Sequence, residues 1–218
     1  MFTHLKICGI TTHEDALAAA ELGIAFLGFN FVEKSPRYVV PEKAKAIIRD
    51  LPAMVNTVGI LVKPTLKDCL KIVETTGVKF LQIYQPLDFD DFGLLPVPVI
   101  AAYRLKNGDA LDYRPGNEHY VLLDAFAPNV YGGTGKRLNW SKIPASVPRE
   151  RLVLAGGITP QNILEALNTV NPAIIDVASG AEKAPGHKDV EKMRALQKAV
   201  LTFNILKMNS LQHYLLNK

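Results

Sequence analysis

The sequence lacks several features that would each identify a class of protein. Its 218 residues include only two cysteines, Cys8 and Cys69, which are too few for a disulfide framework. No apolar run approaches the ~20 residues that a membrane-spanning helix needs. Lys6, Glu14 and Asp15 interrupt the first hydrophobic stretch, so we expect no signal peptide. These absences predict a soluble protein of the reducing cytoplasm, with no membrane partner.

Clusters of basic or metal-binding residues are also absent. The net charge is +4, but lysine and arginine are spread along the chain without a basic run or an aromatic-rich basic patch, so we expect no nucleic-acid partner. The five histidines show no metal-ligand spacing, so we expect no metal. A small positive charge suits a small anionic ligand.

What the sequence does contain is an alternation of strand-like and helix-like segments. The strand-like runs are Leu5–Cys8, Ala25–Val32, Asn56–Val62, Lys79–Tyr84, Val97–Tyr103, His119–Ala125, Arg151–Gly157 and Pro172–Gly180. The clearest helical patterns are Thr12–Leu22, Pro41–Leu51, Thr65–Gly77, Pro160–Val170 and Asp189–Leu201. Eight such units predict an α/β fold, a single-domain (β/α)8 TIM barrel over residues 1–202. An open doubly wound sheet is the alternative, but the turn after the first strand, "CGITT", has one glycine where that fold usually has several.

Residues 203–218 extend beyond what the barrel needs. Ile205, Met208, Leu211 and Leu215 recur at helical spacing, which predicts an extra C-terminal helix. Such a helix would either pack back on the barrel or contact a second subunit. A monomer and a homodimer therefore both stay open.

The active site of such a barrel lies at the carboxyl ends of its strands. This places Cys8 at the end of the first strand and Asp124 at the end of the sixth. Lys6 shares the inward face with Cys8, and a buried lysine needs a partner, which Asp176 on the neighbouring eighth strand could supply. We expect the Lys6 cation to raise the thiolate fraction of Cys8; the alternative is that Cys8 is an inert core residue.

Two glycine-bearing loops follow strands seven and eight, where these barrels usually bind phosphate. They read "AGGITPQN" and "ASGAE". Gly156 and Gly157 would let backbone N–H groups approach an anion closely, and Ser179 and Gly180 lie in the second loop. A pair of glycines can also be a simple turn. The position of both loops predicts a phosphate site.

Three further segments could border this site. The dipeptide Thr159-Pro160 has the pattern of a helix N-cap and first helical residue, so the positive end of a helix would face the phosphate. The loop Glu33–Val39 offers Lys34 and Arg37 to an anion, or is simply solvated. Tyr131–Trp140, "YGGTGKRLNW", lacks the spacing of a Walker loop and is expected to be a loop beside the site.

The motifs "KICGIT", "GFNFVEKSPRYV", "LLDA", "GGTGK", "LAGGITPQNI" and "IDVASGAEKAPGHKD" occur in this order along the chain. In them the sequence resembles the phosphoribosylanthranilate isomerase family of tryptophan biosynthesis. The resemblance implies a TIM barrel and an aldose–ketose isomerase that works without a cofactor. The implied reaction is an Amadori rearrangement, an intramolecular oxidoreduction of N-(5-phosphoribosyl)anthranilate to 1-(2-carboxyphenylamino)-1-deoxyribulose 5-phosphate.

The resemblance also implies roles for individual residues. Cys8 would be the general base and Asp124 the general acid. Arg37 would meet the anthranilate end of the substrate, and the loops with Gly156, Gly157, Ser179 and Gly180 would hold its phosphate. From strand alternation and barrel closure rather than from the resemblance, we expect Lys6 and Asp176 to border the substrate beside Cys8.

The sequence departs from the family pattern at four positions. Tyr84 replaces a histidine, Ala101 an inward lysine, Lys63 an asparagine and Asn139 an aspartate. These departures leave open a non-catalytic barrel that binds a phosphorylated sugar. A second alternative is the related phosphoribosyl-amine isomerase of histidine biosynthesis, which uses paired aspartates, and Cys8 argues against it.

Overall fold

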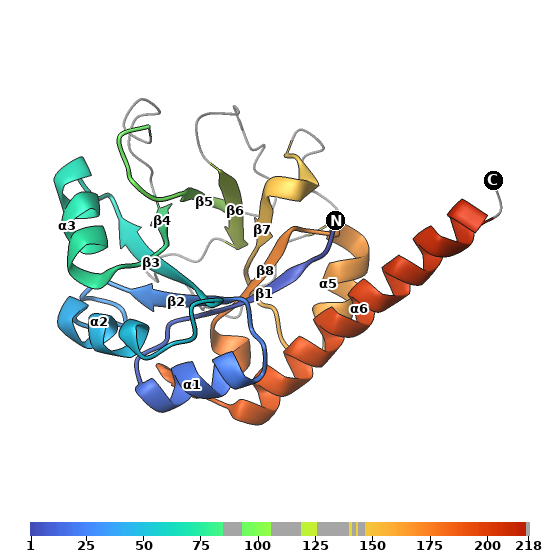
Figure 1. Cartoon of the computed structure of the whole chain (residues 1–218), viewed down its shortest axis with the longest axis horizontal. Helices are drawn as coiled ribbons and strands as arrows, with labels where there is room; N and C mark the ends of the chain where they lie inside the picture. Colours follow the sequence, from blue (N-terminus) through green and yellow to red (C-terminus); the bar gives the residue numbers. More distant parts are fainter. Residues whose placement is uncertain (85–92, 106–118, 126–139, 141–142, 144–146, 217–218) are drawn as a thin grey trace.

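A computed structural model describes residues 1–84, 93–105, 119–125, 140, 143 and 147–216. Within these residues, eight parallel strands close into a barrel in chain order (Figure 1). They are β1 (His4–Cys8), β2 (Phe26–Asn30), β3 (Asn56–Val62), β4 (Phe80–Tyr84), β5 (Val99–Leu105), β6 (Tyr120–Ala125), β7 (Leu152–Leu154) and β8 (Ile174–Val177). Pairing of β1 with β8 closes the ring. The predicted TIM barrel is therefore confirmed, and the open sheet is excluded.

Helices cover the outside of the barrel (Figure 1). The described ones are α1 (His13–Glu21), α2 (Pro41–Arg49), α3 (Leu66–Thr76), α5 (Ile163–Val170) and α6 (Val190–Leu216). Local sequence explains several of their ends. The Thr12 hydroxyl accepts a hydrogen bond from the Asp15 N–H at the start of α1. Thr65 and Asp68 form a reciprocal capping box before α3, and Gly77 ends that helix in the left-handed conformation.

The strand alternation divides the apolar residues into an inner and an outer set. The interior of the barrel is packed with Phe26, Val58, Ile60, Ile100, Leu122 and Val153. The outer faces of the strands pack against the helices through residues such as Leu5, Ile7, Leu27 and Leu154. The inner set of apolar side chains fills the interior of the barrel. The polar groups at the carboxyl ends of the strands therefore pack against an apolar layer.

A short hairpin after β8 was not expected from the sequence. The 3-10 turn η3 (Ser179–Ala181) leads into β9 (Glu182–Ala184), which pairs with β10 (His187–Lys188). Gly186, at a φ of 80°, makes the tight turn between them. This hairpin brings Glu182 and Lys188 back toward the carboxyl end of β1, where Lys188 bonds to Cys8.

The end of the chain is one continuous helix. α6 runs through residue 203, the expected boundary, because neither glycine nor proline interrupts it there, and its last turns project away from the barrel (Figure 1). The Asn204 side chain bonds to both backbone groups of Thr3. Ile205 and Met208 are half exposed, and the side chains of residues 211 and 215 lie outside the described part.

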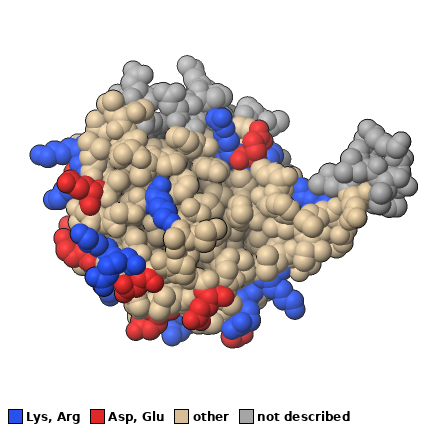
Figure 2. Space-filling model, viewed as in Figure 1, with Lys and Arg blue, Asp and Glu red and all other residues tan. Residues whose placement is uncertain are grey.

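A cleft of 410 Å³ lies between α6 and the start of β1, lined by residues such as Phe2, Leu201 and Ile205. None of the described helices combines the length and apolarity required to cross a membrane. On the face shown in Figure 2, acidic and basic side chains are interspersed.

Candidate active site

Cys8 and Asp124 lie at the same end of the barrel. Cys8 is the last residue of β1, and Asp124 is the penultimate residue of β6. Cys8 packs against the interior cluster of the barrel, and Asp124 is buried. The Tyr84 hydroxyl at the end of β4 donates a hydrogen bond to Asp124 Oδ2 over 3.2 Å. Burial raises the pKa of Tyr84 well above 10.0, and the nearby charges of Asp124 and Cys8 raise it further. The buried Tyr84 hydroxyl therefore interacts electrostatically with both Asp124 and Cys8.

The predicted pair between Lys6 and Asp176 is present. The two residues lie opposite each other in the β1–β8 register, and Lys6 Nζ is 2.9 Å from Asp176 Oδ1. Both side chains are buried. Burial alone would lower the pKa of Lys6, but the Asp176 carboxylate and the Cys8 thiol raise it overall. A Cβ on Gly28 of β2 would come within 3.2 Å of Lys6 Nζ, so this glycine leaves room for the ammonium group.

The Lys6 cation lowers the pKa of the Cys8 thiol, as predicted, but the overall pKa is raised. Burial raises the pKa of the Cys8 thiol, and the Lys6 cation only partly offsets this effect. The Asp176 carboxylate, which neutralises Lys6, also raises the thiol pKa. The sequence pattern gave the neighbouring charge but not the burial, which dominates here.

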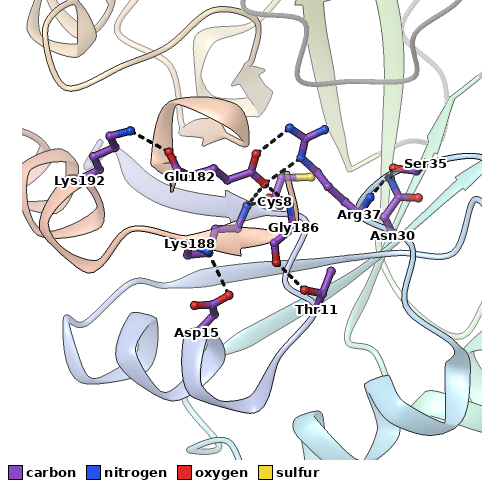
Figure 3. Close-up of polar contacts among 10 residues, drawn as sticks. All are labelled: Cys8, Thr11, Asp15, Asn30, Ser35, Arg37, Glu182, Gly186, Lys188 and Lys192. Atoms are coloured by element: carbon purple, nitrogen blue, oxygen red, sulfur yellow. Dashed lines mark hydrogen bonds and ion pairs between the residues drawn. The ribbon is translucent and has the colours of Figure 1, made fainter. Parts of the chain in front are cut away.

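Arg37 is held in place by a carboxylate that we did not single out from the sequence. Its Nε and Nη2 donate to Glu182 Oε1 and Oε2 over 2.8 and 2.7 Å, a bidentate pair. Lys188 Nζ donates to the same Glu182 Oε1 over 2.7 Å. Figure 3 shows these groups gathered around Cys8. Glu182 and Lys188 are separated from Arg37 by about 150 residues, so no local pattern joins them.

The two predicted phosphate loops lie against each other. Gly156 and Gly157 have φ values of 90° and 66°, in the left-handed region that favours glycine. A Cβ on Gly180 would lie 1.9 Å from the carbonyl oxygen of Ile158, so the loop after β8 touches the loop after β7. Ser179 begins the η3 turn beside this contact.

The expected helix start at Thr159-Pro160 is wrong. Helix α5 begins at Ile163, with Asn162 as its N-cap. The Asn162 side chain instead closes the preceding turn, because its amide donates to Gly157 O and its oxygen accepts from Thr159 N. The N–H groups of Asn162 and Ile163 both donate to the Thr159 carbonyl oxygen, so residues 159–163 form a single turn before α5 begins.

The four departures from the family pattern fall in different places. Tyr84 faces inward beside Asp124, as described above. Ala101 packs on the outer face of β5 with Leu81 and Val99, so its expected inward position is wrong. The exposed Lys63 has a φ of 49°, a conformation that asparagine adopts more readily than lysine. Asn139 lies outside the described residues, as does the Tyr131–Trp140 loop except for the buried Trp140.

Arg104 is a further inward residue that we did not single out from the sequence. Its guanidinium lies 4.8 Å from the centre of the Tyr84 ring, in a cation–π contact, and its position in β5 is opposite Asp124 in β6. The residues of β5 that precede Arg104 are apolar on both faces, so the sequence did not show which face points inward. Among the described residues, no group of three histidine, cysteine, aspartate or glutamate side chains could hold a metal ion.

Comparisons with known proteins agree on one family. The family model described as N-(5'phosphoribosyl)anthranilate (PRA) isomerase matches residues 5–199. The N-(5'-phosphoribosyl)anthranilate isomerase of Citrifermentans bemidjiense is 43% identical over 198 residues, which is 89% of this chain and 95% of that protein.

Solved structures show the same relationship. The phosphoribosyl anthranilate isomerase of Thermus thermophilus is 34% identical and superposes with a TM-score of 0.82, over 91% of this chain and 98% of that one. Another, 33% identical with a TM-score of 0.78 over 93% of this chain and 100% of that one, was solved in complex with reduced 1-(o-carboxyphenylamino)-1-deoxyribulose 5-phosphate.

Proposed function

The chain belongs to the N-(5'-phosphoribosyl)anthranilate isomerase family, and from this premise we propose that Cys8 and Asp124 carry out its reaction as general base and general acid. The activity is the isomerisation of N-(5'-phosphoribosyl)anthranilate to 1-(2-carboxyphenylamino)-1-deoxyribulose 5-phosphate, an Amadori rearrangement of tryptophan biosynthesis. The position of both residues at the carboxyl ends of barrel strands, where Tyr84 donates a hydrogen bond to Asp124, is the observation that supports these roles.

In the first step, protonated Asp124 donates its proton to the ring oxygen of the ribose. The bond between that oxygen and C1 breaks, and the nitrogen lone pair forms a Schiff base with C1. In the second step, the Cys8 thiolate removes the proton from C2 to give an enolamine. The enolamine then tautomerises to the ketone product. One group starts protonated and the other deprotonated, which requires two different environments within one site.

The remaining predicted residues would hold the two ends of the substrate. The backbone around Gly156, Gly157 and Gly180, together with Ser179, would bind the phosphate, since both loops meet at one place. Arg37 would bind the carboxylate of the anthranilate, in an orientation fixed by its bonds to Glu182. The Lys6–Asp176 pair would border the ribose next to Cys8.

Replacement of the proposed acid and base tests these roles. Cys8→Ala and Asp124→Ala should each lower kcat by at least about 10²–10⁴-fold, the usual contribution of a general acid or base. Circular dichroism should show an unchanged fold. Cys69→Ala removes the other cysteine, which is buried on α3, and should retain turnover. Substantial conversion by the Cys8 or Asp124 variant would refute that residue's role.

The same assay addresses a non-catalytic barrel. That alternative requires the wild-type chain to bind the substrate without converting it. Calorimetry with the substrate, run beside the turnover assay, separates binding from conversion.

We also infer a cytoplasmic protein that is a monomer or a homodimer. Membership of an amino-acid biosynthesis family supports this location. The exposed side chains of Leu201, Ile205 and Leu206 on α6 support the homodimer. Light scattering distinguishes the 23.9 kDa monomer from a species of twice that mass.

A further inference from the structure

Lys188 is a buried cation in direct contact with the residue that carries the proposed base. It is 1% exposed. Its ammonium donates to the backbone oxygen of Cys8 over 2.6 Å and to Glu182 Oε1 over 2.7 Å. Burial lowers the pKa of Lys188 overall, and the Glu182 carboxylate partly offsets this effect by favouring the charged ammonium form. A lysine at this position is costly to bury, so its place beside Cys8 calls for an explanation.

Glu182 holds two cations at once. Both of its oxygens accept from Arg37, and Oε1 also accepts from Lys188 and from the Gly186 N–H over 3.2 Å (Figure 3). Burial alone would raise the pKa of Glu182, but Arg37 and Lys188 lower it overall. The carboxylate is therefore ionised at neutral pH, and its partners are fixed in orientation.

The Arg37 side chain also lies close to the backbone beside Cys8. A Cβ on Gly9 would lie 2.5 Å from Arg37 Cδ, so the arginine stem lies across the backbone next to Cys8. The φ of Gly9 is 82°, a conformation that also favours glycine. Arg37 and Lys188 thus approach Cys8 from two different segments, the loop after β2 and the β9–β10 hairpin.

The charged groups around the Cys8 thiol can be divided into a neutral pair and a positively charged cluster. Lys6 and Asp176 form a neutral pair on the barrel side of Cys8. Tyr84 is neutral, because burial first and then nearby acidic groups raise its pKa well above 10.0. Arg37 and Lys188 bring two positive charges and Glu182 one negative charge, so this cluster of three residues carries a net charge of +1.

Two more charged residues contact this cluster from neighbouring helices. Asp15 of α1 accepts from the Lys188 backbone N–H over 3.1 Å, and Lys192 of α6 donates to the Glu182 backbone oxygen over 2.7 Å. Lys192 is exposed to solvent, which screens its charge. These two charges are of opposite sign, so they do not remove the surplus of the buried cluster.

We propose that Lys188 and Arg37, both held by Glu182, are positioning residues whose surplus positive charge stabilises the thiolate form of Cys8. This inference deepens the proposed function, because a base must be deprotonated before it accepts the C2 proton. The cluster opposes the effect of burial, which disfavours the thiolate.

The pKa of Cys8 itself provides the test, measured as the pH dependence of alkylation by iodoacetamide in the full-length protein. Lys188→Met removes one positive charge and should raise the pKa by about one unit, and Glu182→Gln removes the negative charge and should lower it by about one unit. Lys188→Arg keeps the charge and should stay near wild type. Lys192→Met removes an exposed lysine bonded to the same Glu182 and should leave the pKa unchanged. Cys8→Ser reports any signal from Cys69.

Opposite shifts in the Lys188→Met and Glu182→Gln variants would support the proposal. Shifts in the same direction, or none, would overturn it, because damage to the fold alone does not depend on the sign of the lost charge. If Lys188→Met does not fold, a raised or unchanged value in Glu182→Gln is sufficient to overturn it. The proposed function is judged separately, by the turnover of Cys8→Ala. Loss of turnover there, with no shift in the charge variants, would leave Cys8 as the base and reject the cluster.

Discussion

Removing one member of the Lys6–Asp176 pair should destabilise the barrel far more than removing both. Asp176→Asn leaves a lysine that is 0% exposed without its carboxylate. At the 2.9 Å separation of Nζ and Oδ1, an effective dielectric constant of about 20 gives an attraction of about 6 kcal/mol. Desolvation of the two ions opposes it with several kcal/mol each. The intact pair is therefore close to neutral, whereas a single loss costs about 3–5 kcal/mol.

A double-mutant cycle in urea measures this difference. Asp176→Asn and Lys6→Met should each lower the free energy of unfolding by about 3–5 kcal/mol, and the double variant should lose much less than either of them. Because the folded-state pKa of Lys6 is raised above 10.5, its stabilisation is fully present below pH 10.5 and is lost only at higher pH. Measurements at pH 7 therefore report the whole effect. Arg49→Met, which breaks an exposed pair with Asp50, is the control and should barely move the urea midpoint.

The outcome that refutes this reasoning is additivity. If the double variant loses as much free energy of unfolding as the two single variants together, the two side chains stabilise the fold independently. The buried ion pair would then not account for the losses in the single variants. A single variant that does not fold leaves the comparison intact, because the double variant should then still fold.

Three further predictions concern the candidate site. Tyr84→Phe should lower kcat about three- to tenfold with little change in KM, since Asp124 loses one hydrogen bond. Tyr84→His, which can restore a hydrogen-bond donor, should recover part of the rate. Unchanged kinetics in Tyr84→Phe would exclude the hydroxyl from catalysis. Gly180→Ala should raise KM at least about tenfold, because its Cβ would push apart Ile158 and the two loops proposed to bind phosphate. An unchanged KM would place the phosphate elsewhere. Burial would raise the pKa of Glu182, but its cationic partners hold it below 4.5, so its stabilisation is present above pH 4.5 and lost as the pH falls through the lower folded-state value. Glu182→Gln should therefore flatten the acid side of the stability–pH curve in urea titrations, and a curve as steep as wild type would contradict this.

Much of the molecule could be predicted from residue patterns because those patterns reflect local geometry. The period-two alternation in β1 gave the shared inward face of Lys6 and Cys8. The same alternation in β8, combined with closure of eight strands, gave Asp176 as the partner of Lys6. Closure is itself a consequence of the repeated strand–helix unit, so this long-range contact followed from local information.

Other predictions were wrong where two local sequence patterns compete, or where a strand has no alternation of apolar and polar residues. Thr159-Pro160 has the pattern of a helix start, but these residues lie in a turn to which Asn162 adds a side-chain bond to Gly157, and the helix begins at Ile163. The run around Ala101 is apolar on both faces, so the sequence did not show that Ala101 points outward. Both outcomes depend on neighbours that the pattern does not specify.

The sequence by itself determined the barrel and the carboxyl ends of β1 and β6, and therefore the placement of Cys8 and Asp124. It could do so because backbone periodicity and strand closure are properties of the chain's own order. Only the tertiary structure decided the electrostatics of the site. The β9–β10 hairpin brings Lys188 to Cys8, 180 residues away in the sequence, and Glu182 to Arg37, 145 residues away. Burial of a thiol depends on all the side chains that exclude water from it.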